Sequence, residues 1–342
     1  MTTNREVIVT SLPEGTLTSD HFEMRPGAMP VAGEGEAVIR TILMSIDAAN
    51  RAWMQGATYR EPVLAGDAMH TFSIGEVVSS THPRLTPGTI VGAEARWADY
   101  AVIKAKQAVK IGDHRPLTHH LSVLGVAGKT AYMGLVHVGR PKAGETVLVS
   151  AAAGSVGIYV GQIAKALGCK VIGIAGGPEK CAWVVDELGF DGCVDYRTPG
   201  FFKALRGACP DGVDIYFDNV GGKILETALF AMNDRGRVVC CGAVSQYDSA
   251  TPSGPRNLPG AIVVKRLRME GFIVMDYAAE DAAALADLRA MVASGALNQA
   301  RCKPFAIIQQ VHRLSRNLPG ASFKGKLQFY HDPLLKGFIG SA

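Results

Sequence analysis

The pattern of apolar and polar positions along the chain changes once, close to Gly144. Before that residue, short apolar runs are interrupted by Pro or Gly at intervals of about ten residues, which is typical of a small antiparallel sheet or barrel. We therefore expect short strands in this part of the chain, at 7–10, 36–43, 72–78, 89–91 and 100–103.

After Gly144, strand-like and helix-like patterns alternate. The expected strands cover 145–150, 170–174, 193–196, 213–218, 237–242 and 269–274. The expected helices cover 156–167, 179–188, 222–232 and 279–293. Strands that are apolar on both faces and separated by helices predict a parallel sheet covered on both sides. A series of such strands matches the doubly wound α/β fold that binds dinucleotides.

Length and pattern together predict two domains. The chain has 342 residues, more than the roughly 250–300 at which a single hydrophobic core stops growing. The C-terminal segment returns to the mixed pattern of the beginning, so we expect 1–122 and 300–342 to form one β-rich domain. Residues 123–299 would form the second domain, a Rossmann-type dinucleotide-binding unit.

Composition and charge narrow the classes of function. Lys and Arg number 35 and Asp and Glu 31, a net charge of +4, with no dense basic stretch. We therefore expect no nucleic-acid partner and no membrane partner. The most apolar stretch, 147–167, is interrupted by polar residues, and we expect no secretory leader. Seven cysteines without a Cys-x-x-Cys spacing favour a reducing, cytoplasmic setting.

The strongest chemical signal is the glycine loop that follows the strand at 145–150. It reads Ala-Ala-Ala-Gly-Ser-Val-Gly and contains the candidate cofactor-binding residues Ala151, Gly154, Ser155, Val156 and Gly157. Gly154 would let the backbone approach a pyrophosphate, and Gly157 would let the next helix pack against the strand. The free N–H groups at the helix N-terminus would bind the phosphates. The alternative is a glycine-rich turn that only packs.

The end of the next strand indicates which dinucleotide is bound. An NAD site places a carboxylate there for the ribose 2′-hydroxyl, whereas this strand ends at Ala175-Gly176 without an acid. A small loop leaves room for a 2′-phosphate, and Lys180 offers it a positive charge, so we predict NADP(H). Two alternatives stay open: Glu179 could swing back as the missing acid, and Lys180 could be an ordinary solvated helix charge.

The sequence predicts chemistry without a metal. The first cysteine is Cys169, and His70 and the pair at 119–120 lack a second ligand at a recognisable spacing. Gly128-Lys129-Thr130 resembles the end of a phosphate-binding Walker loop, but Val123 stands where that loop requires glycine. We therefore expect neither a metal centre nor a Walker-type nucleotide site.

Several longer motifs resemble one known family. They read GKTAYMGL at 128–135, VSAAAG at 149–154, AGGPEK at 175–180, FDNVGG at 217–222, CGAVSQY at 241–247 and RMEGF at 268–272. Together they are similar to the zinc-free medium-chain dehydrogenase/reductases. Within that family they are most similar to the branch of prostaglandin reductase, 2-alkenal reductase and NADPH-dependent curcumin reductase. The resemblance covers about residues 5–330.

The resemblance implies a fold, an activity and several roles. It implies a GroES-like β-rich domain beside the Rossmann domain, with the cofactor in the cleft between them. The activity would be reduction of the C=C bond of an α,β-unsaturated aldehyde or ketone by NADPH. The matching positions imply that Lys180 and Tyr196 contact the 2′-phosphate, Asn219 the nicotinamide half and Tyr247 the substrate carbonyl. The strand at 269–274 would pair across a homodimer.

The sequence departs from the family pattern at the expected pocket and near the C-terminus. Ala49 stands where the family has an aromatic residue, so a wall of the substrate pocket would be missing. Tyr59 is a second candidate pocket aromatic, and Met275 lies in another loop expected to shape the pocket. Ser322 replaces an asparagine that contacts the cofactor in the family, with one residue inserted nearby.

Tyr247 is the candidate catalytic residue. It follows the strand at 237–242, at the edge of the sheet where ligands bind in open α/β folds. Its phenol could donate a hydrogen bond to the carbonyl oxygen as hydride reaches the β-carbon; the alternative is a tyrosine in a surface loop. Two other functions stay open: a quinone reductase of the same superfamily, and a protein that binds NADP(H) without turnover.

Overall fold

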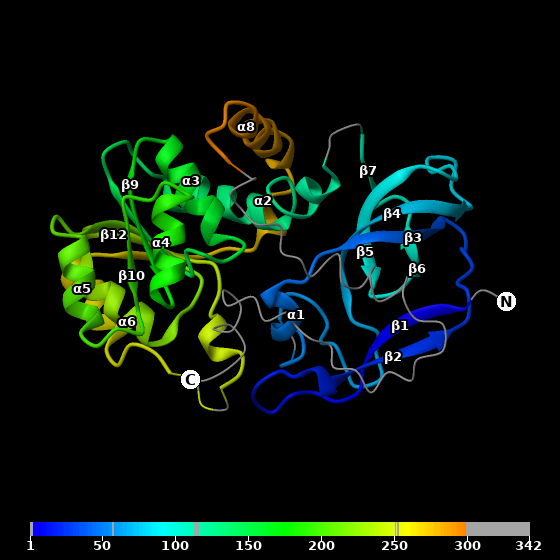
Figure 1. The fold of residues 1–342 in the computed structure, drawn as a ribbon, viewed down its shortest axis with the longest axis horizontal. Helices are drawn as coiled ribbons and strands as arrows, with labels where there is room; N and C mark the ends of the chain where they lie inside the picture. The colour runs from blue at the N-terminus through cyan, green and yellow to red at the C-terminus, as the bar shows by residue number, and fades with distance from the viewer. Residues whose placement is uncertain (1–2, 57, 113–115, 250, 252, 299–342) are drawn as a thin grey trace. The chain divides into compact units, whose positions relative to one another are not determined.

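The computed structural model describes residues 3–56, 58–112, 116–249, 251 and 253–298. These residues form two compact units, one reaching Leu121 and one beginning at Ser122 (Figure 1). Segment 300–342, which the sequence assigns to the first domain, lies outside the described residues, and so does Ser322.

The first unit contains the antiparallel sheets that the sequence predicts. Its five-stranded sheet has the order β6-β3-β4-β5-β7, and β1 and β2 form a separate antiparallel pair. The elements are β1 (Asn4–Val9), β2 (Phe22–Gly27), β3 (Glu36–Met44), α1 (Ala48–Ala52), β4 (His70–Ser80), β5 (Ile90–Arg96), β6 (Tyr100–Lys104) and β7 (Val109–Lys110). Apolar side chains such as Ile39, Val77 and Val91 are buried between the strands because successive residues point to opposite faces.

The second unit is built on a six-stranded parallel sheet. Its strand order is β10-β9-β8-β11-β12-β13, and every neighbouring pair is parallel. The strands are β8 (Thr146–Ser150), β9 (Lys170–Ala175), β10 (Gly192–Asp195), β11 (Val213–Asp218), β12 (Met232–Cys240) and β13 (Arg268–Gly271). In chain order this is 3-2-1-4-5-6, the doubly wound arrangement, so the predicted fold class is confirmed.

Helices cover both faces of the parallel sheet (Figure 1). Val147 and Val149 of β8 pack in one layer with α2, α3, α4 and α8. Leu148 points to the opposite layer, which contains residues of α5, α6 and α7. The helices are α2 (Val126–Tyr132), α3 (Gly157–Ala166), α4 (Pro178–Asp186), α5 (Phe201–Ala208), α6 (Gly222–Ala231), α7 (Leu258–Lys265) and α8 (Asp281–Ala293). This two-sided burial is why the strands are apolar on both faces.

The direction of the strand order reverses between β8 and β11. Both strands run parallel, so their carboxyl ends, Ser150 and Asp218, meet at the same edge of the sheet, and the Ser150 hydroxyl donates to Oδ1 of Asp218 at 3.1 Å. In open α/β sheets this reversal opens the crevice in which ligands bind. The fold therefore places the glycine loop after β8 beside the turn after β11.

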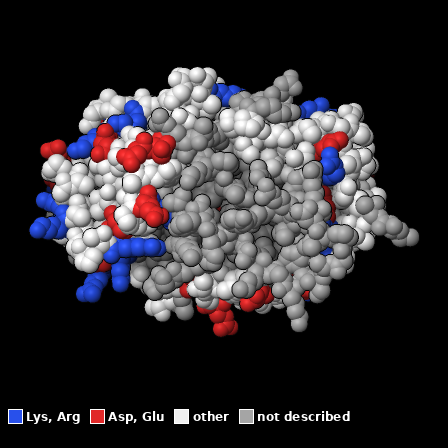
Figure 2. Space-filling model, in the orientation of Figure 1, with Lys and Arg blue, Asp and Glu red and all other residues white. Residues whose placement is uncertain are grey.

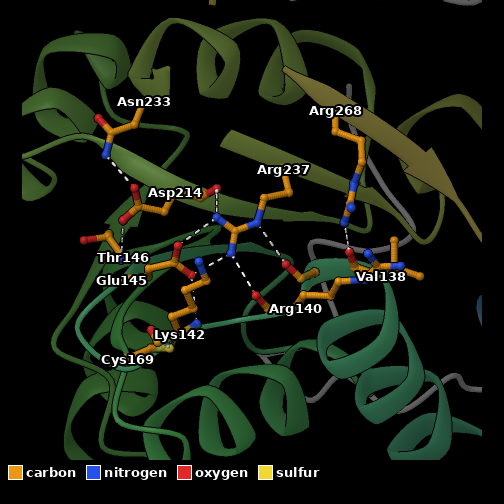
Figure 3. A network of polar contacts seen from close by, with 11 residues as sticks. Val138, Arg140, Lys142, Glu145, Thr146, Cys169, Asp214, Asn233, Arg237 and Arg268 are labelled. Atoms are coloured by element: carbon orange, nitrogen blue, oxygen red, sulfur yellow. Dashed lines mark hydrogen bonds and ion pairs between the residues drawn. The ribbon is translucent and has the colours of Figure 1, made fainter. Parts of the chain in front are cut away.

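A polar network connects the strands on the opposite side of the same sheet, near the amino-terminal ends of the strands (Figure 3). Arg237 at the start of the paired part of β12 forms two hydrogen bonds with Glu145, at 2.6 and 2.9 Å. It also donates to the carbonyl oxygens of Gly139 and Arg140, at 2.9 and 3.0 Å. Asp214 of β11 accepts the N–H of Thr146 at 2.8 Å. One arginine thus links β12 to the segment that leads into β8.

Neither a membrane-spanning helix nor, on the face drawn in Figure 2, a continuous field of one charge is found among the described residues. Within the described residues, no helix is both long and apolar enough to cross a bilayer. On the face drawn in Figure 2, basic and acidic side chains of the described residues occur together, and neither covers the surface continuously.

Candidate functional site

The glycine loop has the tight geometry that its sequence predicts. Ala151 follows β8 with a φ of 47°, in the left-handed region. A Cβ atom at Gly157 would lie only 2.2 Å from the carbonyl oxygen of Ala151, so only glycine fits where α3 begins. The loop therefore brings the first turn of α3 against the end of β8.

The N-terminus of α3 offers a set of backbone donors. The N–H groups of Ala152 and Gly154 are used inside the unit, by the carbonyls of Ile174 and Ala151. Within the described part of the chain, the N–H groups of Ser155, Val156 and Gly157 have no acceptor. Three such groups at the positive end of a helix suit a phosphate, and the pyrophosphate of a dinucleotide fits this cradle.

The loop after β9 is hydrogen-bonded to a carboxylate of the neighbouring strand, β10. Oδ1 of Asp195 accepts the N–H groups of Gly177 and Arg197, each at 2.9 Å. Gly177 has a φ of 94°, which favours glycine, and Pro178 then starts α4. Glu179 is exposed on the first turn of that helix. The acidic residue that pairs with the end of β9, Asp195, thus accepts hydrogen bonds from backbone N–H groups.

Side chains of one aromatic and one basic residue lie over Gly176. A Cβ atom at Gly176 would be 2.9 Å from the Tyr196 ring and 3.1 Å from Nε of Arg197. The Arg197 guanidinium lies 5.7 Å from the Tyr196 ring centre. Lys180, on the first turn of α4, is 7% exposed. The sequence predicted Gly176, Lys180 and Tyr196 for this position and missed Arg197, whose only signal was its place directly after Tyr196.

Asn219, at the end of β11, is fixed against the end of β8. Its side-chain Nδ2 donates to the carbonyl oxygen of Ser150 at 2.8 Å, and its backbone N–H donates to the Ser150 hydroxyl at 2.9 Å. Within the described residues, Oδ1 of Asn219 makes no hydrogen bond. The side chain is therefore oriented by its nitrogen, and its oxygen remains for a ligand.

Tyr247 lies at the same edge of the sheet. It follows a 3₁₀ turn at Val244–Gln246, and its hydroxyl would be 3.6 Å from a Cβ atom placed at Gly242. The same point is 3.4 Å from the backbone oxygen of Asn219. That oxygen accepts the N–H of Val244 at 3.2 Å. The structure thus brings Ser150, Asn219 and Tyr247 together from the ends of three strands.

The first unit holds the other predicted pocket residues. Ala49 is half-buried in α1, and Tyr59 is 49% exposed in the segment that follows. Trp53, which the sequence analysis missed, donates from Nε1 to the Tyr59 hydroxyl at 3.3 Å. The Arg60 guanidinium stacks over the Trp53 ring at 4.2 Å. An aromatic pair therefore lies within one short segment of Ala49, where the sequence suggested a missing wall.

Met275 is 53% exposed in a 3₁₀ turn of the second unit at Val274–Tyr277. A pocket shared by Met275, Ala49 and Tyr59 stays a prediction. Among the described side chains, no group of three or more His, Cys, Asp or Glu residues is arranged to hold a metal ion.

The strand order and the glycine loop define the class of Rossmann-type, dinucleotide-binding proteins. Residues 5–111 match the family described as the N-terminal domain of oxidoreductase, and residues 155–290 match the family described as zinc-binding dehydrogenase.

Individual relatives cover most of the chain. The chain is 41% identical over 281 residues to the NADPH-dependent curcumin reductase of Escherichia coli (strain K12), covering 80% of this chain and 81% of that protein. It is 37% identical over 282 residues to the 2-alkenal reductase (NADP(+)-dependent) of Nicotiana tabacum, covering 80% and 82%. The solved structure of CurA in complex with NADPH from Vibrio vulnificus matches with a TM-score of 0.81 and 35% identity, covering 89% and 96%.

The chain belongs to the medium-chain dehydrogenase/reductases, in the zinc-independent branch that contains curcumin reductase, prostaglandin reductase and 2-alkenal reductase. The family predicted from the sequence motifs is confirmed.

Proposed function

We propose that this protein reduces the C=C bond of α,β-unsaturated aldehydes and ketones with NADPH. The observation that carries the proposal is the convergence of three strand ends, which present the glycine loop, Asn219 and Tyr247 at one edge of the sheet. Relatives whose names specify NADPH or NADP and the substrates curcumin and 2-alkenal support the cofactor and the substrate class.

The protein's own residues supply binding and orientation. The donors at Ser155, Val156 and Gly157 would hold the pyrophosphate, and Asn219 would accept from the nicotinamide half. The 2′-phosphate would lie among Lys180, Tyr196 and Arg197, two of which carry positive charge. NADPH, when bound, supplies the hydride that reaches the β-carbon of the substrate.

Tyr247 would act on the carbonyl end of the substrate. As hydride adds to the β-carbon, negative charge develops on the carbonyl oxygen, and a neutral phenol donates a hydrogen bond to it. A preorganised donor of this kind contributes about 2.7–4 kcal/mol to transition-state stabilisation. The α-carbon then takes a proton, and Tyr247 is the candidate donor if the enolate is the stronger base.

A turnover assay tests the proposal. The protein is mixed with NADPH and either 2-hexenal or an aryl enone, and the near-ultraviolet absorbance of NADPH is followed while products are identified. We expect NADPH oxidation with formation of the saturated carbonyl compound. Turnover with quinones alone would replace the proposal with a quinone reductase, and binding of NADPH without any turnover would replace it with a binding protein.

We also propose that the protein acts in the cytoplasm as a homodimer joined through β13. Among the described strands β13 pairs only with β12, so its other edge is open to another chain. Helix α7, which precedes it, exposes Val263 and Val264 at 72% and 69%, and Phe230 of α6 is 58% exposed. An apolar helix surface beside an open strand edge suits a second copy of the chain.

A further inference from the structure

Asp218 is a buried carboxylate at the switch point of the parallel sheet, and the chemistry described above does not use it. Its side chain is 2% exposed. One oxygen, Oδ1, accepts from the Tyr216 hydroxyl at 2.7 Å and from the Ser150 hydroxyl at 3.1 Å. The same oxygen accepts the backbone N–H groups of Val220 and Gly221 at 3.0 and 2.9 Å.

Holding a carboxylate in this place is costly for the fold. Burial raises the pKa of Asp218, although the four hydrogen bonds oppose that shift. The neighbouring carboxylate also contributes to the raised pKa of Tyr216, after burial as the larger cause. A carboxylate that is unfavourable to bury and yet accepts four hydrogen bonds on one oxygen points to a role in geometry rather than in net stability.

The contacts of Asp218 fix the atoms that would face the cofactor. Ser150 donates to Asp218, and its hydroxyl oxygen in turn accepts the N–H of Asn219 at 2.9 Å. The carbonyl oxygen of Ser150 accepts a second hydrogen bond from the same residue, from Nδ2 of Asn219 at 2.8 Å. These two hydrogen bonds with Ser150 orient the side-chain amide of Asn219, so that its Nδ2 faces Ser150 and its Oδ1 faces away from it.

A second branch leads from Asp218 to the segment that carries Tyr247. The bonds from Val220 and Gly221 fix the turn after β11. The carbonyl of Val220 then accepts the Ser245 hydroxyl at 2.7 Å and the Ser245 N–H at 3.2 Å. Because Ser245 lies in the 3₁₀ turn before Tyr247, the position of the tyrosine depends on that turn.

We propose that Asp218 is a positioning residue, whose carboxylate holds Asn219 and the turn before Tyr247 in place for the nicotinamide half of NADPH. The proposal rests on the proposed function. Asp218 acts through its hydrogen-bonded neighbours and contacts neither cofactor nor substrate.

Binding at the adenosine half of the site can be compared with binding at the nicotinamide half to test the role of Asp218. Gly176 and Arg197 follow the ends of β9 and β10, Lys180 lies on α4, and the hydrogen bonds to Oδ1 of Asp218 come from other residues: Ser150, Tyr216, Val220 and Gly221. A change confined to the switch point should therefore weaken contacts to nicotinamide and spare contacts to adenosine. The ligand 2′,5′-ADP reports on the adenosine half alone, and NADPH reports on both halves.

The experiment compares Asp218→Asn with Asp214→Asn, its matched control. Asp214 lies on the same strand, and its carboxylate also accepts two hydrogen bonds, from Thr146 and Asn233, but at the opposite edge of the sheet (Figure 3). The measurements are the Kd for 2′,5′-ADP and for NADPH, kcat with an enone, and the deuterium isotope effect on kcat from labelled NADPH.

For Asp218→Asn we expect kcat to fall about tenfold or more, because the hydrogen bonds to Oδ1 lose their charged partner. The isotope effect should rise, because hydride transfer becomes slower than product release. The Kd for 2′,5′-ADP should stay within about twofold of its original value, whereas NADPH should bind several-fold more weakly. Asp214→Asn should change the melting temperature and leave the ratio of the two Kd values and the isotope effect unchanged.

The asparagine variant is expected to fold, since a neutral amide is easier to bury than a carboxylate. If it does not fold, Tyr216→Phe removes the 2.7 Å bond to Oδ1 and carries the same test with a smaller expected effect. Equal weakening of both ligands, or an unchanged kcat, would overturn the role of Asp218. Failure of the unmodified protein to bind NADPH would instead overturn the proposed function, and this proposal with it.

Discussion

At the scale of single residues, the candidate site depends on which side-chain atoms form hydrogen bonds within the protein and which do not. The amide nitrogen of Asn219 donates to Ser150, and within the described residues its oxygen accepts no hydrogen bond, so we expect that oxygen to bind the cofactor. Asp195 uses a carboxylate oxygen to accept two backbone N–H groups, from Gly177 in the β9–α4 loop and from Arg197. Arg197 lies close to Gly176, and we expect the positive charges of Arg197 and Lys180 to favour NADPH over NADH.

Tyr247→Phe tests the proposed donor to the carbonyl oxygen. The change removes one hydroxyl, so kcat should fall about 10²-fold, the effect of losing one preorganised donor. The Kd for NADPH should remain within about twofold, because we expect the phenol to contact substrate rather than cofactor. Steady-state kinetics with an enone and fluorescence titration with NADPH check both values, and an unchanged kcat would remove Tyr247 from the mechanism.

Lys180→Ala and Arg197→Ala test the 2′-phosphate site. Each variant should raise KM for NADPH about tenfold, because a charge-assisted contact to the phosphate is lost, and should leave KM for NADH nearly unchanged. Arg206→Ala, an exposed cation on α5, serves as the control and should alter neither constant. Equal effects on the two cofactors would mean that the 2′-phosphate is recognised elsewhere.

Sequence reasoning succeeded for residues whose role is local and missed those defined by a neighbour in space. The glycine at 157 follows from the strand–loop–helix pattern alone, and the structure shows the close approach that requires it. Arg197 and Trp53 were not predicted, because only the structure shows which residues they contact. Arg197 lies over Gly176, and Trp53 lies beside Tyr59. The catalytic and binding roles of Tyr247, Lys180 and Asn219 stay predictions.

At the scale of elements, periodicity predicted the parallel strands and most of their helices. Three helices that pack on this sheet, α2, α5 and α7, were not predicted. Helix α5 starts after Gly200, at a φ of 80°, with no acidic residue in its first turn. Helix α7 reads LPGAIVVK and is apolar at most positions, so its sequence lacks the separate apolar and polar faces by which an amphipathic helix is recognised. Its start is set by Asn257, whose side chain accepts the N–H of Gly260 at 3.1 Å.

Arg237→Ala tests how the N-terminal edge of the parallel sheet is held. The ion pair with Glu145 is mostly buried, with side chains 17% and 20% exposed, so we expect a loss of about 2–4 kcal/mol in the free energy of unfolding. Arg266→Ala is the control, because its ion pair with Asp234 is 55% and 62% exposed and should contribute below about 1 kcal/mol. Chemical denaturation measures both values.

The same ion pair predicts a pH dependence. Burial alone would raise the pKa of Glu145, but hydrogen bonds from Arg237 and Lys142 and their charges outweigh it and lower the pKa below its ordinary 4.5. A lowered pKa gives stability that is complete above the unfolded value and is lost as pH falls through the folded value. The difference between the original protein and Arg237→Ala should therefore shrink between about pH 5 and pH 3. A difference that is constant over this range would contradict the role of Glu145.

At the scale of the whole molecule, the fold class and family could be predicted from the sequence because the family motifs, at 128–272, follow the strands and loops of the second unit, and the strand pattern before Gly144 indicated a separate β-rich unit. The motifs report on sheet topology and loop shape, which follow from short segments. Assembly could not be derived in the same way, because an apolar exposed surface becomes evident only when helices and strand edges are placed. The homodimer and the cytoplasmic setting stay predictions.

Light scattering after size-exclusion chromatography tests the dimer. A chain of 36.2 kDa should elute with about twice that mass. Replacing Val263 and Val264 by Glu should give the monomer, because charge would enter the proposed apolar contact, while NADPH binding persists. Val31→Glu, at another exposed valine, should leave the mass unchanged. A monomeric unmodified protein would contradict the proposal.

The position that the transferred hydride takes in the product distinguishes reduction of the C=C bond from reduction of the carbonyl group. NADPH carrying deuterium at the reactive carbon of its nicotinamide ring, prepared in both stereochemical forms, is reacted with a 2-alkenal in the presence of the protein, and the products are analysed by NMR. We expect a saturated aldehyde with deuterium on the β-carbon from one of the two forms. An allylic alcohol with deuterium on the former carbonyl carbon, or full retention of deuterium in the cofactor, would contradict the proposed function.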